Sequence, residues 1–435
     1  MRTNIVHIGA DELTYEIREI IEVAKKIEKF GLPITWENIG DPVAKEEKIP
    51  KWIKDIVKKE VEKNESFGYC PTKGVESTRE FLANLRNKYP GAKITKEDII
   101  FFNGLGDAIS KMYTYLNRSA RVIGPSPAYS THSSAEAAHS GGDHIAYKLD
   151  PRNGWLPDFE ELRNKIKYNP NIAGILIINP DNPTGLVYDR EVMERFADIA
   201  REFDLFLICD EIYTNVWHNG IRPVRLSEVV GDDVCGISMR GISKEFPWPG
   251  ARCGWIEVYN KNKDAQFARY IKTILDAKML EVCSTTLPQM ALPKIMSDPK
   301  YRKHHKQRNE KFAKRAEIAY NTLKDIDGII VNKPGGAFYM TVVFDDKVLN
   351  KKQKLKIKNK KLQDFIEKEV KGVDLDKRFV YYLMASSGIC VVPLSGFSCD
   401  LPGFRITLLE TNDEKFRSVF ETLAEKMKEY LTNNA

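Results

Sequence analysis

Four side chains of three chemical types occur in this order along the chain: Asp210, Lys244, Arg252 and Arg405. Together they supply a carboxylate, an amine and two guanidinium groups. Each guanidinium group can bind an anion through paired donors. A site that uses an aldehyde cofactor to make an amino-acid carbon acidic requires such groups. It needs an amine for the aldehyde, a carboxylate, a clamp for a phosphate and a contact for the substrate carboxylate. The combination predicts such a site, whereas any one of these residues alone would say little.

Lys244 lies in the segment SKEFPWPGAR, after an apolar run that we expect to be a buried strand. A lysine in such a place is poorly solvated. Desolvation and neighbouring cations lower the pKa of an ammonium group and leave a free amine that can form a Schiff base. The alternative is an ordinary surface lysine, because the chain contains 67 lysines and arginines in total.

Asp210 ends the apolar run DLFLIC. Its carboxylate is therefore expected at the carboxyl edge of a sheet, where ligands bind in open α/β folds. There it can keep the nitrogen of a pyridine ring protonated and make the ring an electron sink. The alternative is a cap for a helix that begins in EIYTNV. Tyr213 follows on the same side of a helical turn, where its hydroxyl can donate to a ring oxygen.

Asn182 lies in NPDNPTG, a turn-rich loop after the apolar run AGILII. Its residue types are explained by turn chemistry alone, but an amide at the exit of a strand can also donate to a cofactor oxygen. Residues 103–108, NGLGDA, follow another strand and open a helix. Their backbone N–H groups can face a phosphate, with Arg252 supplying charge. The segment lacks the third glycine of a dinucleotide fingerprint and the GK[ST] of a Walker motif.

Two further residues have a structural and a functional interpretation. Tyr129 in SPAYS follows a strand and can stack on a planar ring; it can equally be a packed surface aromatic. Arg405 in GFRITLL stands in a predicted strand, where burying a charge is costly. Either a bidentate contact with a substrate carboxylate or a structural ion pair would explain it.

Apolar patterns between these residues indicate the elements that position them. Helical periodicity covers residues 12–30, 75–89, 105–117, 189–203, 306–324, 360–371 and 413–431. Short apolar runs typical of strands lie at residues 120–124, 144–149, 173–178, 205–209, 234–239 and 253–259. Alternation of buried strands with helices predicts an α/β fold with a mainly parallel sheet covered by helices on both faces.

The pattern changes in the last third of the chain to that of a smaller α+β domain. GGAFYMTVVF and GICVVPLSGF each read as a strand, and the terminal helix is amphipathic. We expect residues 51–310 to form the large domain and 311–435 the small one. Residues 1–50, with a helix and the segment LPITWENIGDP, are expected to pack with the small domain and make it discontinuous.

Residues 347–361, KVLNKKQKLKIKNKK, are compositionally unusual. They can be a phosphate- or RNA-binding patch. A solvated insertion in the small domain is the better interpretation, because no aromatic side chains that could stack on bases are interleaved.

Composition excludes several classes of protein. The 435 residues are 42% hydrophobic and 29% charged with a net charge of +6, which is typical of a soluble globular protein and gives no reason to expect nucleic acid as a partner. No apolar run is long enough for a membrane helix, and the start of the chain lacks the apolar core of a secretion signal. The seven cysteines form no CxxC pair, so we expect reduced thiols, a cytoplasmic location and no bound metal.

Taken together, the motifs resemble those of the class I and II aminotransferases, the aspartate-aminotransferase-like group of fold-type-I pyridoxal-phosphate enzymes. SKxxxxxGxR with NPxNPTG and DExY is highly specific for this family, and the resemblance runs from ELTYEIREI and NIGDP to FRITLL. It implies pyridoxal 5'-phosphate as cofactor. It also implies a seven-stranded, mainly parallel sheet in the large domain, a small domain from both termini, and a homodimer with active sites at the interface.

The resemblance further implies roles for individual residues. Lys244 corresponds to the lysine that holds the cofactor as a Schiff base, and Asp210 to the partner of the pyridine nitrogen. Tyr69, in FGYCPTKG, corresponds to a tyrosine that reaches the phosphate in the neighbouring subunit. The other implied contacts are Asn182 and Tyr213 with the phenolic oxygen, Tyr129 with the ring, Arg252, Leu105 and Gly106 with the phosphate, and Gly40, Asn182 and Arg405 with the substrate carboxylate.

Two departures from the family pattern concern the phosphate. Gly241 stands where members often carry a hydroxyl residue, three positions before the lysine, and the Gly-Leu-Gly segment 104–106 offers neither lysine nor hydroxyl. Backbone donors would therefore carry more of the phosphate binding.

The predicted function is transfer of an amino group from an α-amino acid to a 2-oxo acid. Lys244 would move the proton as general base and acid, and Asp210 and Tyr213 would tune the cofactor. A β-lyase or decarboxylase acting on the same site is the alternative, because fold and site hardly discriminate these reactions. A cofactor-sensing regulator is disfavoured, since family-like sequence begins near residue 10 and leaves no room for a DNA-binding domain. The sequence does not identify the amino acid.

Overall fold

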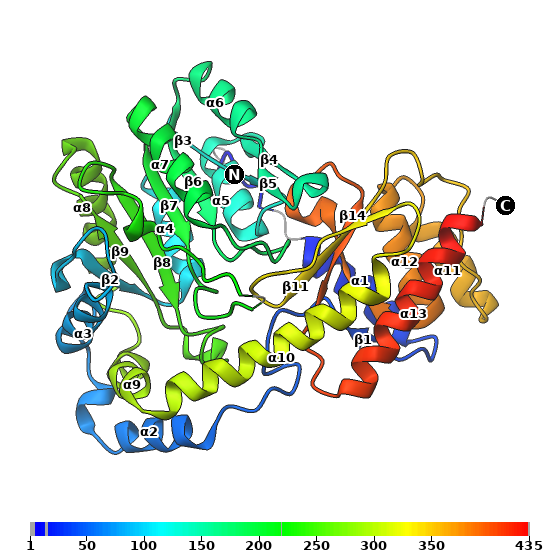
Figure 1. The fold of residues 1–435 in the computed structure, drawn as a ribbon, viewed down its shortest axis with the longest axis horizontal. Helices are drawn as coiled ribbons and strands as arrows, with labels where there is room; N and C mark the ends of the chain where they lie inside the picture. The colour runs from blue at the N-terminus through cyan, green and yellow to red at the C-terminus, as the bar shows by residue number, and fades with distance from the viewer. Residues whose placement is uncertain (1–4, 14–15, 219, 434–435) are drawn as a thin grey trace.

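The computed structural model describes residues 5–13, 16–218 and 220–433. They form a large and a smaller domain that lie side by side (Figure 1). The long helix α10 (Lys300–Leu323) runs from the large domain to the small one.

The large domain is built on one sheet, whose strands are β2 (Ile99–Phe102), β3 (Arg121–Ser126), β4 (Ala146–Asp150), β5 (Leu156–Pro157), β6 (Ile172–Ile178), β7 (Phe206–Asp210), β8 (Gly236–Gly241) and β9 (Gly254–Tyr259). Their order is β2-β9-β8-β7-β6-β3-β4-β5. Strands β8, β7, β6, β3 and β4 are mutually parallel, whereas β9 is antiparallel to both of its neighbours. The predicted seven-stranded, mainly parallel sheet is confirmed, with the two-residue β5 added at one edge.

Both faces of this sheet are buried, as the near-continuous apolar runs of its strands require. Along β6, Ile175 and Ile177 belong to one hydrophobic core, while Leu176 and Ile178 belong to the other. One face is covered by α4 (Leu105–Thr114) and α8 (Ala265–Met279). The other is covered by α3 (Glu76–Arg86), α6 (Phe159–Lys167), α7 (Arg190–Phe203) and α9 (Thr286–Ser297). Helix α2 (Lys51–Val61) packs on α9, and α5 (Ser130–Ser140) lies beside α4.

The small domain contains an antiparallel sheet in the order β10-β11-β14-β13, from β10 (Ile329–Val331), β11 (Tyr339–Phe344), β13 (Val392–Pro393) and β14 (Gly403–Thr407). Its helices are α11 (Lys360–Glu369), α12 (Leu375–Ser387) and α13 (Asp413–Thr432). The N-terminal segment joins this domain, because β1 (Thr35–Trp36) pairs in parallel with β12 (Ile389–Cys390) and α1 (Glu16–Glu28) packs against α12. The expected small domain from both chain ends is thus observed.

Several elements differ from the sequence expectations. GICVVPLSGF is not one strand: it forms β12, β13 and then a 3₁₀ turn, Leu394–Phe397. Pro393 lacks an N–H donor and so cannot continue a ladder. Helix α10 begins at Lys300, before the expected residue 306. The periodicity also missed the helices α2, α5, α6, α8, α9 and α12.

The lysine-rich residues 347–361 form a loop on the small domain that leads into α11. Leu355 and Ile357 are buried in the main core, and Leu349 lies beside them. The lysines between these apolar residues point to solvent. The segment is therefore anchored by its apolar residues, while its charges remain hydrated.

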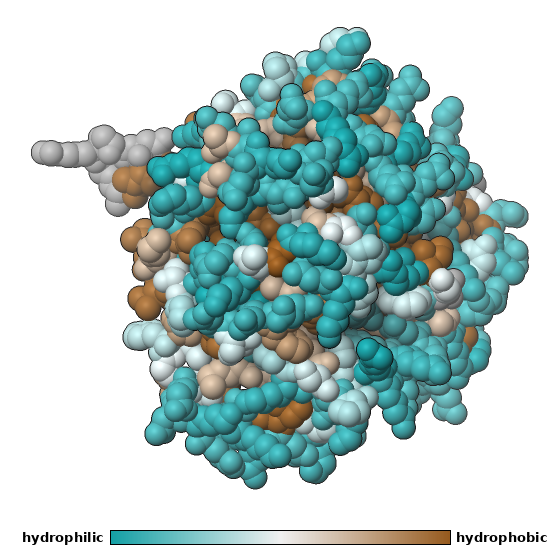
Figure 2. All heavy atoms as spheres, turned by 60° about the vertical axis from the view of Figure 1, so that its left-hand side comes forward, coloured by the Kyte–Doolittle hydropathy of each residue, from teal (hydrophilic) through white to brown (hydrophobic). Residues whose placement is uncertain are grey.

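The surface is largely polar. Figure 2 shows one face, on which hydrophilic residues predominate and hydrophobic ones are exposed in small groups. In the described part of the chain, none of the helices has the length and apolar character needed to cross a membrane.

Candidate active site

A cavity of about 340 Å³ lies at the carboxyl ends of the central parallel strands, where the two domains meet. The large domain contributes the ends of β6, β7 and β8 and the start of α4, while the N-terminal segment and the small domain contribute Asn38, Gly40, Tyr339 and Arg405. Every predicted site residue except Tyr69 lines this cavity. The topology therefore brings together side chains that are more than 300 residues apart in sequence.

Lys244 follows the end of β8 and reaches across to the N-terminal segment. Its Nζ donates to the carbonyl oxygen of Gly40 at 2.6 Å. Burial lowers the pKa of this amine to about 8. The positive charges of Arg405 and Arg252 add to the decrease, and Asp41 opposes it. About a tenth of the amine is consequently neutral and nucleophilic at pH 7, far more than for an ordinary lysine.

Asp210 is buried at the carboxyl end of β7, as the apolar run before it predicts. Its Oδ2 lies 3.1 Å from Nε2 of His132, and its Oδ1 accepts a hydrogen bond from the backbone N–H of Ile212 at 3.0 Å. The bond to Ile212 closes a turn, and residues 211–216 form turns and no helix, so the interpretation of Asp210 as a helix cap was wrong. The carboxylate is nonetheless part of the cavity wall.

Tyr213 lies on the turn after β7, and its hydroxyl is 3.0 Å from the hydroxyl of Tyr339 on β11. Burial raises the pKa of Tyr213 well above its ordinary value, so this group remains a hydrogen-bond donor. Gly40 packs against Tyr339: a Cβ at this position would lie 2.2 Å from the hydroxyl of Tyr339. Glycine at position 40 is required by that close approach.

Arg405 projects from β14 and is buried. Its Nη1 donates to Oδ1 of Asn182 at 3.2 Å, and Nη2 donates to the carbonyl oxygen of Asn38. The guanidinium group lies 4.4 Å from the ring centre of Tyr339. Its Nε has no hydrogen-bond partner, and no carboxylate of the described residues forms an ion pair with it. The structural ion pair considered from the sequence is therefore absent there, and the cavity retains a buried cation with an unused donor.

Arg252 and the start of α4 form the opposite end of the cavity. Gly104, the cap of α4, has a φ of 85°. A Cβ at Gly104 would lie 2.2 Å from Nη2 of Arg252, which donates to the carbonyl oxygen of Asn103 at 3.3 Å. The space beside Gly106 is open. Because the first N–H groups of a helix lack intrahelical acceptors, this end combines a guanidinium group with free backbone donors.

Tyr69 and Gly241, both singled out in the sequence, differ in position: Gly241 lines the cavity and Tyr69 does not. Tyr69 follows a 3₁₀ turn, Asn64–Phe67, and lies outside the cavity with 86% of its surface exposed. Gly241 ends β8, and a Cβ there would meet the carbonyl oxygen of Cys253 at 3.1 Å. The close packing of β8 and β9 thus disfavours a side chain at position 241. Ser243, two residues later, supplies a hydroxyl to the cavity wall.

Sequence reasoning missed two residues that the geometry makes prominent. His132, on α5, contacts Asp210, and Tyr339, on β11, contacts Tyr213. The spacing of Tyr129 and His132 at the start of α5 was an available signal for His132, because residues three apart share a helix face. No comparable signal identified Tyr339, whose position depends on the approach of the small domain.

Comparison with known proteins identifies this arrangement. The family model for aminotransferases of class I and II matches residues 38–423. The chain belongs to the class I and II aminotransferase family. An uncharacterised aminotransferase of Methanocaldococcus jannaschii is 60% identical over 99% of this chain and 100% of its own length. The glutamate-pyruvate aminotransferase AlaA of Escherichia coli is 28% identical over 78% of this chain and 82% of its own.

Solved structures agree with the family assignment. The alanine aminotransferase of Pyrococcus furiosus superposes with a TM-score of 0.84 at 25% identity, covering 98% of this chain and 100% of that one. An aspartate aminotransferase of Thermus thermophilus superposes with a TM-score of 0.81 at 21% identity, over 98% and 100% of the two chains, and shares the fold. The predicted fold, family and enzyme class, a pyridoxal-phosphate-dependent transaminase, are confirmed.

Proposed function

We propose that this aminotransferase transfers the amino group of an α-amino acid to a 2-oxo acid, with pyridoxal 5'-phosphate held by Lys244 in the cavity between the domains. The observation that carries the proposal is an amine whose pKa is lowered to about 8, lining the same cavity as a buried carboxylate at a strand end. An amine of this kind condenses with an aldehyde.

The residues present fit the cofactor. Arg252 and the backbone N–H groups of Leu105 and Gly106 would hold the phosphate, with the hydroxyl of Ser243 nearby in the wall. Asp210 would face the pyridine nitrogen, kept in place by His132. Asn182 and Tyr213 would contact the phenolic oxygen, and Tyr129 would pack on the ring face. When bound, the cofactor accepts the electron pair left on the α-carbon as its proton departs.

The protein's own groups would perform the other tasks. Nζ of Lys244, released from the cofactor when the amino group of the substrate replaces it, would take the proton from the α-carbon and return it at the neighbouring cofactor carbon as general base and acid. Arg405 would bind the α-carboxylate through Nη1 and Nη2, the nitrogens that now contact Asn182 and Asn38. Closing the cavity around the substrate would exclude water from the reacting atoms.

We further propose that alanine is among the amino-acid substrates. Within the described residues, the cavity has three cationic side chains, Lys244, Arg252 and Arg405, and the roles proposed above use all of them. None is left for a second carboxylate on the substrate in the same subunit. The relatives named as alanine and glutamate-pyruvate aminotransferases support this proposal.

A half-reaction screen tests the proposal. The cofactor-loaded protein is mixed with single amino acids, and loss of the absorbance of the bound cofactor is followed; we expect a response to alanine. Borohydride treatment and peptide mapping should then place the cofactor on Lys244. Lys244→Ala should lose turnover by at least about a thousandfold, while Lys428→Ala serves as a surface control. Full turnover by Lys244→Ala would overturn the assignment.

We also infer a homodimer, in which Tyr69 reaches the phosphate of the neighbouring subunit. Tyr69 and Phe67 are 86% and 73% exposed, and Leu280 is 85% exposed. The loop that carries Tyr69 is held against residues 284–286, since Thr286 donates to the carbonyl oxygen of Gly68 at 2.7 Å. An exposed apolar surface of this kind is typical of an interface.

The seven free cysteines support a location in the cytoplasm.

A further inference from the structure

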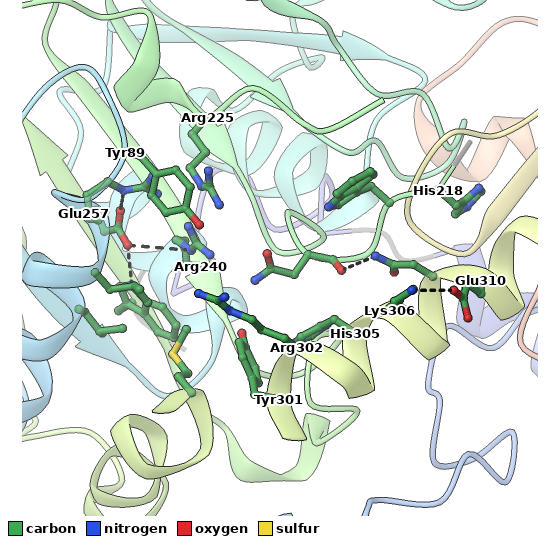
Figure 3. A pocket seen from close by; sticks show the side chains of 18 of the residues that line it. Tyr89, His218, Arg225, Arg240, Glu257, Tyr301, Arg302, His305, Lys306 and Glu310 are labelled. Carbon is green, nitrogen blue, oxygen red and sulfur yellow. Dashed lines mark hydrogen bonds and ion pairs between the residues drawn. The ribbon is translucent and has the colours of Figure 1, made fainter. Parts of the chain in front are cut away.

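A second cavity of about 550 Å³ lies between α3, the first half of α10 and the strands β8 and β9 (Figure 3). It is on the face of the sheet that α3 and α9 cover, because Arg240 on β8 and Trp255 and Glu257 on β9 line it. Their neighbours Met239 and Ile256 belong to the core on the other face. None of the roles proposed for the catalytic cavity involves this one.

The two cavities are separated by one wall. Asp210 and Lys244 line the catalytic cavity. Each is followed in sequence by a glutamate whose carboxylate is directed to the other side. Glu211 forms ion pairs with Arg86 and Arg240, and Glu245 accepts a hydrogen bond from Asn215 at 2.7 Å. Arg86, Arg240 and Asn215 all line the second cavity.

The lining of the second cavity is rich in cationic side chains. Those described are Arg86, Arg225, Arg240, Arg302 and Lys306; Glu257 and Glu310 also line the cavity, and Glu211 pairs with Arg86 and Arg240. Figure 3 shows the guanidinium groups of Arg225, Arg240 and Arg302 converging on the middle of the cavity. Burial and the neighbouring charges of Arg240 and Arg86 lower the pKa of Arg225. An anion between these groups would relieve their mutual repulsion.

Three of these arginines have donors without an acceptor, one of which is Nη1 of Arg86. Arg225 is 6% exposed, and its Nε and Nη1 donate no hydrogen bond, although Glu228 lies 3.5 Å from Nη1. Arg302 is exposed and forms no hydrogen bond or ion pair with any residue that the structure describes. Buried polar groups in proteins are almost always satisfied. Arg225, at the wall of the cavity, is therefore unusual among buried guanidinium groups in having donors without an acceptor.

The remaining walls are aromatic and apolar. The guanidinium group of Arg225 lies 3.7 Å from the ring centre of Tyr89. Trp217, Trp255 and Tyr301 also line the cavity, together with Leu82. A free inorganic anion would leave these surfaces in contact with water. A ligand with a planar or apolar body would cover them, in the manner of small-molecule sites that combine apolar walls with a few polar anchors.

We propose that this cavity is a second ligand site, for a small organic anion whose carboxylate or phosphate binds Arg225 and Arg302 while its aromatic body packs against Tyr89 and the two tryptophans. The ligand need not be an amino acid or an oxo acid, because no amine comparable to Lys244 lines this cavity. The proposal does not depend on the amino-acid specificity of the catalytic site.

Calorimetric titration of the cofactor-loaded protein tests the proposal with four probes. Phenyl phosphate and benzoate carry both features, inorganic phosphate carries only the charge, and benzyl alcohol carries only the ring. We expect phenyl phosphate or benzoate to bind at least about tenfold more tightly than either partial probe. Whichever of phenyl phosphate and benzoate binds more tightly identifies phosphate or carboxylate as the recognised group. If neither phenyl phosphate nor benzoate binds more tightly than benzyl alcohol, the proposal is overturned.

Variants locate the binding. Arg225→Gln and Arg302→Gln should each weaken the better probe by about tenfold, because each removes a charged donor. The exposed Arg118→Gln is the matched control and should bind as the parent does. Arg302 lies at the exposed edge of the cavity, so its variant remains informative if Arg225→Gln does not fold. Quenching of tryptophan fluorescence by the probe gives an independent readout. Unchanged affinity in Arg302→Gln would place the probe elsewhere and refute the assignment.

Discussion

At the scale of single residues, the reactivity of the Lys244 amine is set by its surroundings. Its pKa of about 8 lies below the ordinary 10.5 because the folded protein desolvates the charged form and places Arg405 and Arg252 nearby. The neutral amine therefore gains population as the pH rises through about 8. We predict that acylation of Lys244 in the cofactor-free protein, followed by mass spectrometry, has its midpoint there.

The same titration has an internal test. Replacing Arg405 by glutamine removes a cation that lowers the pKa of Lys244, so the midpoint should move to higher pH. A midpoint near 10.5 in the parent protein would contradict the assigned environment.

His132 is predicted to position Asp210. Its Nε2 lies 3.1 Å from Oδ2 of that carboxylate, and both residues are buried. His132→Leu removes a hydrogen bond to a charged group and should lower kcat by about ten- to a hundredfold. His132→Gln, which retains a donor, should recover part of the loss. Steady-state kinetics with a fixed oxo acid measure both variants, and a change in KM alone would argue against the role.

At the scale of elements, the start of α4 depends on one backbone conformation. Gly104 has a φ of 85° and leaves room for the guanidinium group of Arg252, 2.2 Å from where a Cβ would be. Gly104→Ala should therefore lower the free energy of unfolding of the cofactor-free protein by about 1–3 kcal/mol. It should also weaken phosphate binding, since Arg252 must move. Urea denaturation and cofactor titration measure the two effects.

Gly106→Ala is the matched control for stability. Its Cβ would meet no atom within 4 Å, and it lies inside the helix, where alanine is favoured over glycine. The free energy of unfolding of this variant should be unchanged or higher. Equal destabilisation by both substitutions would show that the left-handed conformation of Gly104 is not the cause.

The elements also differed in how clearly their sequences announced them. Helices α7 and α13 have an amphipathic pattern and were expected almost at their observed bounds. Helix α9 contains Pro293 in its interior, and α5 is rich in small and polar residues with little separation of faces. Their formation is decided by packing against neighbouring elements, which overrides weak local propensity.

At the scale of the whole molecule, the exposed Tyr69 predicts active sites shared between subunits. Tyr69→Ala and Lys244→Ala should each be impaired alone. Hybrids of the two would contain one intact site if Tyr69 acts in the neighbouring subunit. A random mixture should then recover activity toward about a quarter of the parental level, because half of the dimers are hybrids with one intact site of two. Co-expressed, separately tagged chains provide the material.

Hybrids of Lys244→Ala with Arg405→Gln provide the control for this experiment. Lys244 and Arg405 line the same cavity of one chain, so every hybrid has one defect in each site and should stay inactive. Recovery in this control, or none in the Tyr69 mixture, would be inconsistent with the shared site.

The sequence alone was sufficient for residues whose chemistry and local setting coincide. Asp210 at the end of an apolar strand, Lys244 after another, and glycines where a helix begins each combine a reactive or permissive group with a recognisable local pattern. Such patterns reflect short-range physics: burial of strands, capping of helices and the conformational freedom of glycine.

Only the tertiary structure decided which distant groups meet. The approach of the small domain places Tyr339 against Tyr213 and Gly40, and the packing of α5 places His132 against Asp210. The cationic second cavity arises where α10 crosses the sheet near β8 and β9. Contacts of this kind depend on the summed packing of many elements, so no local segment of the sequence contains them.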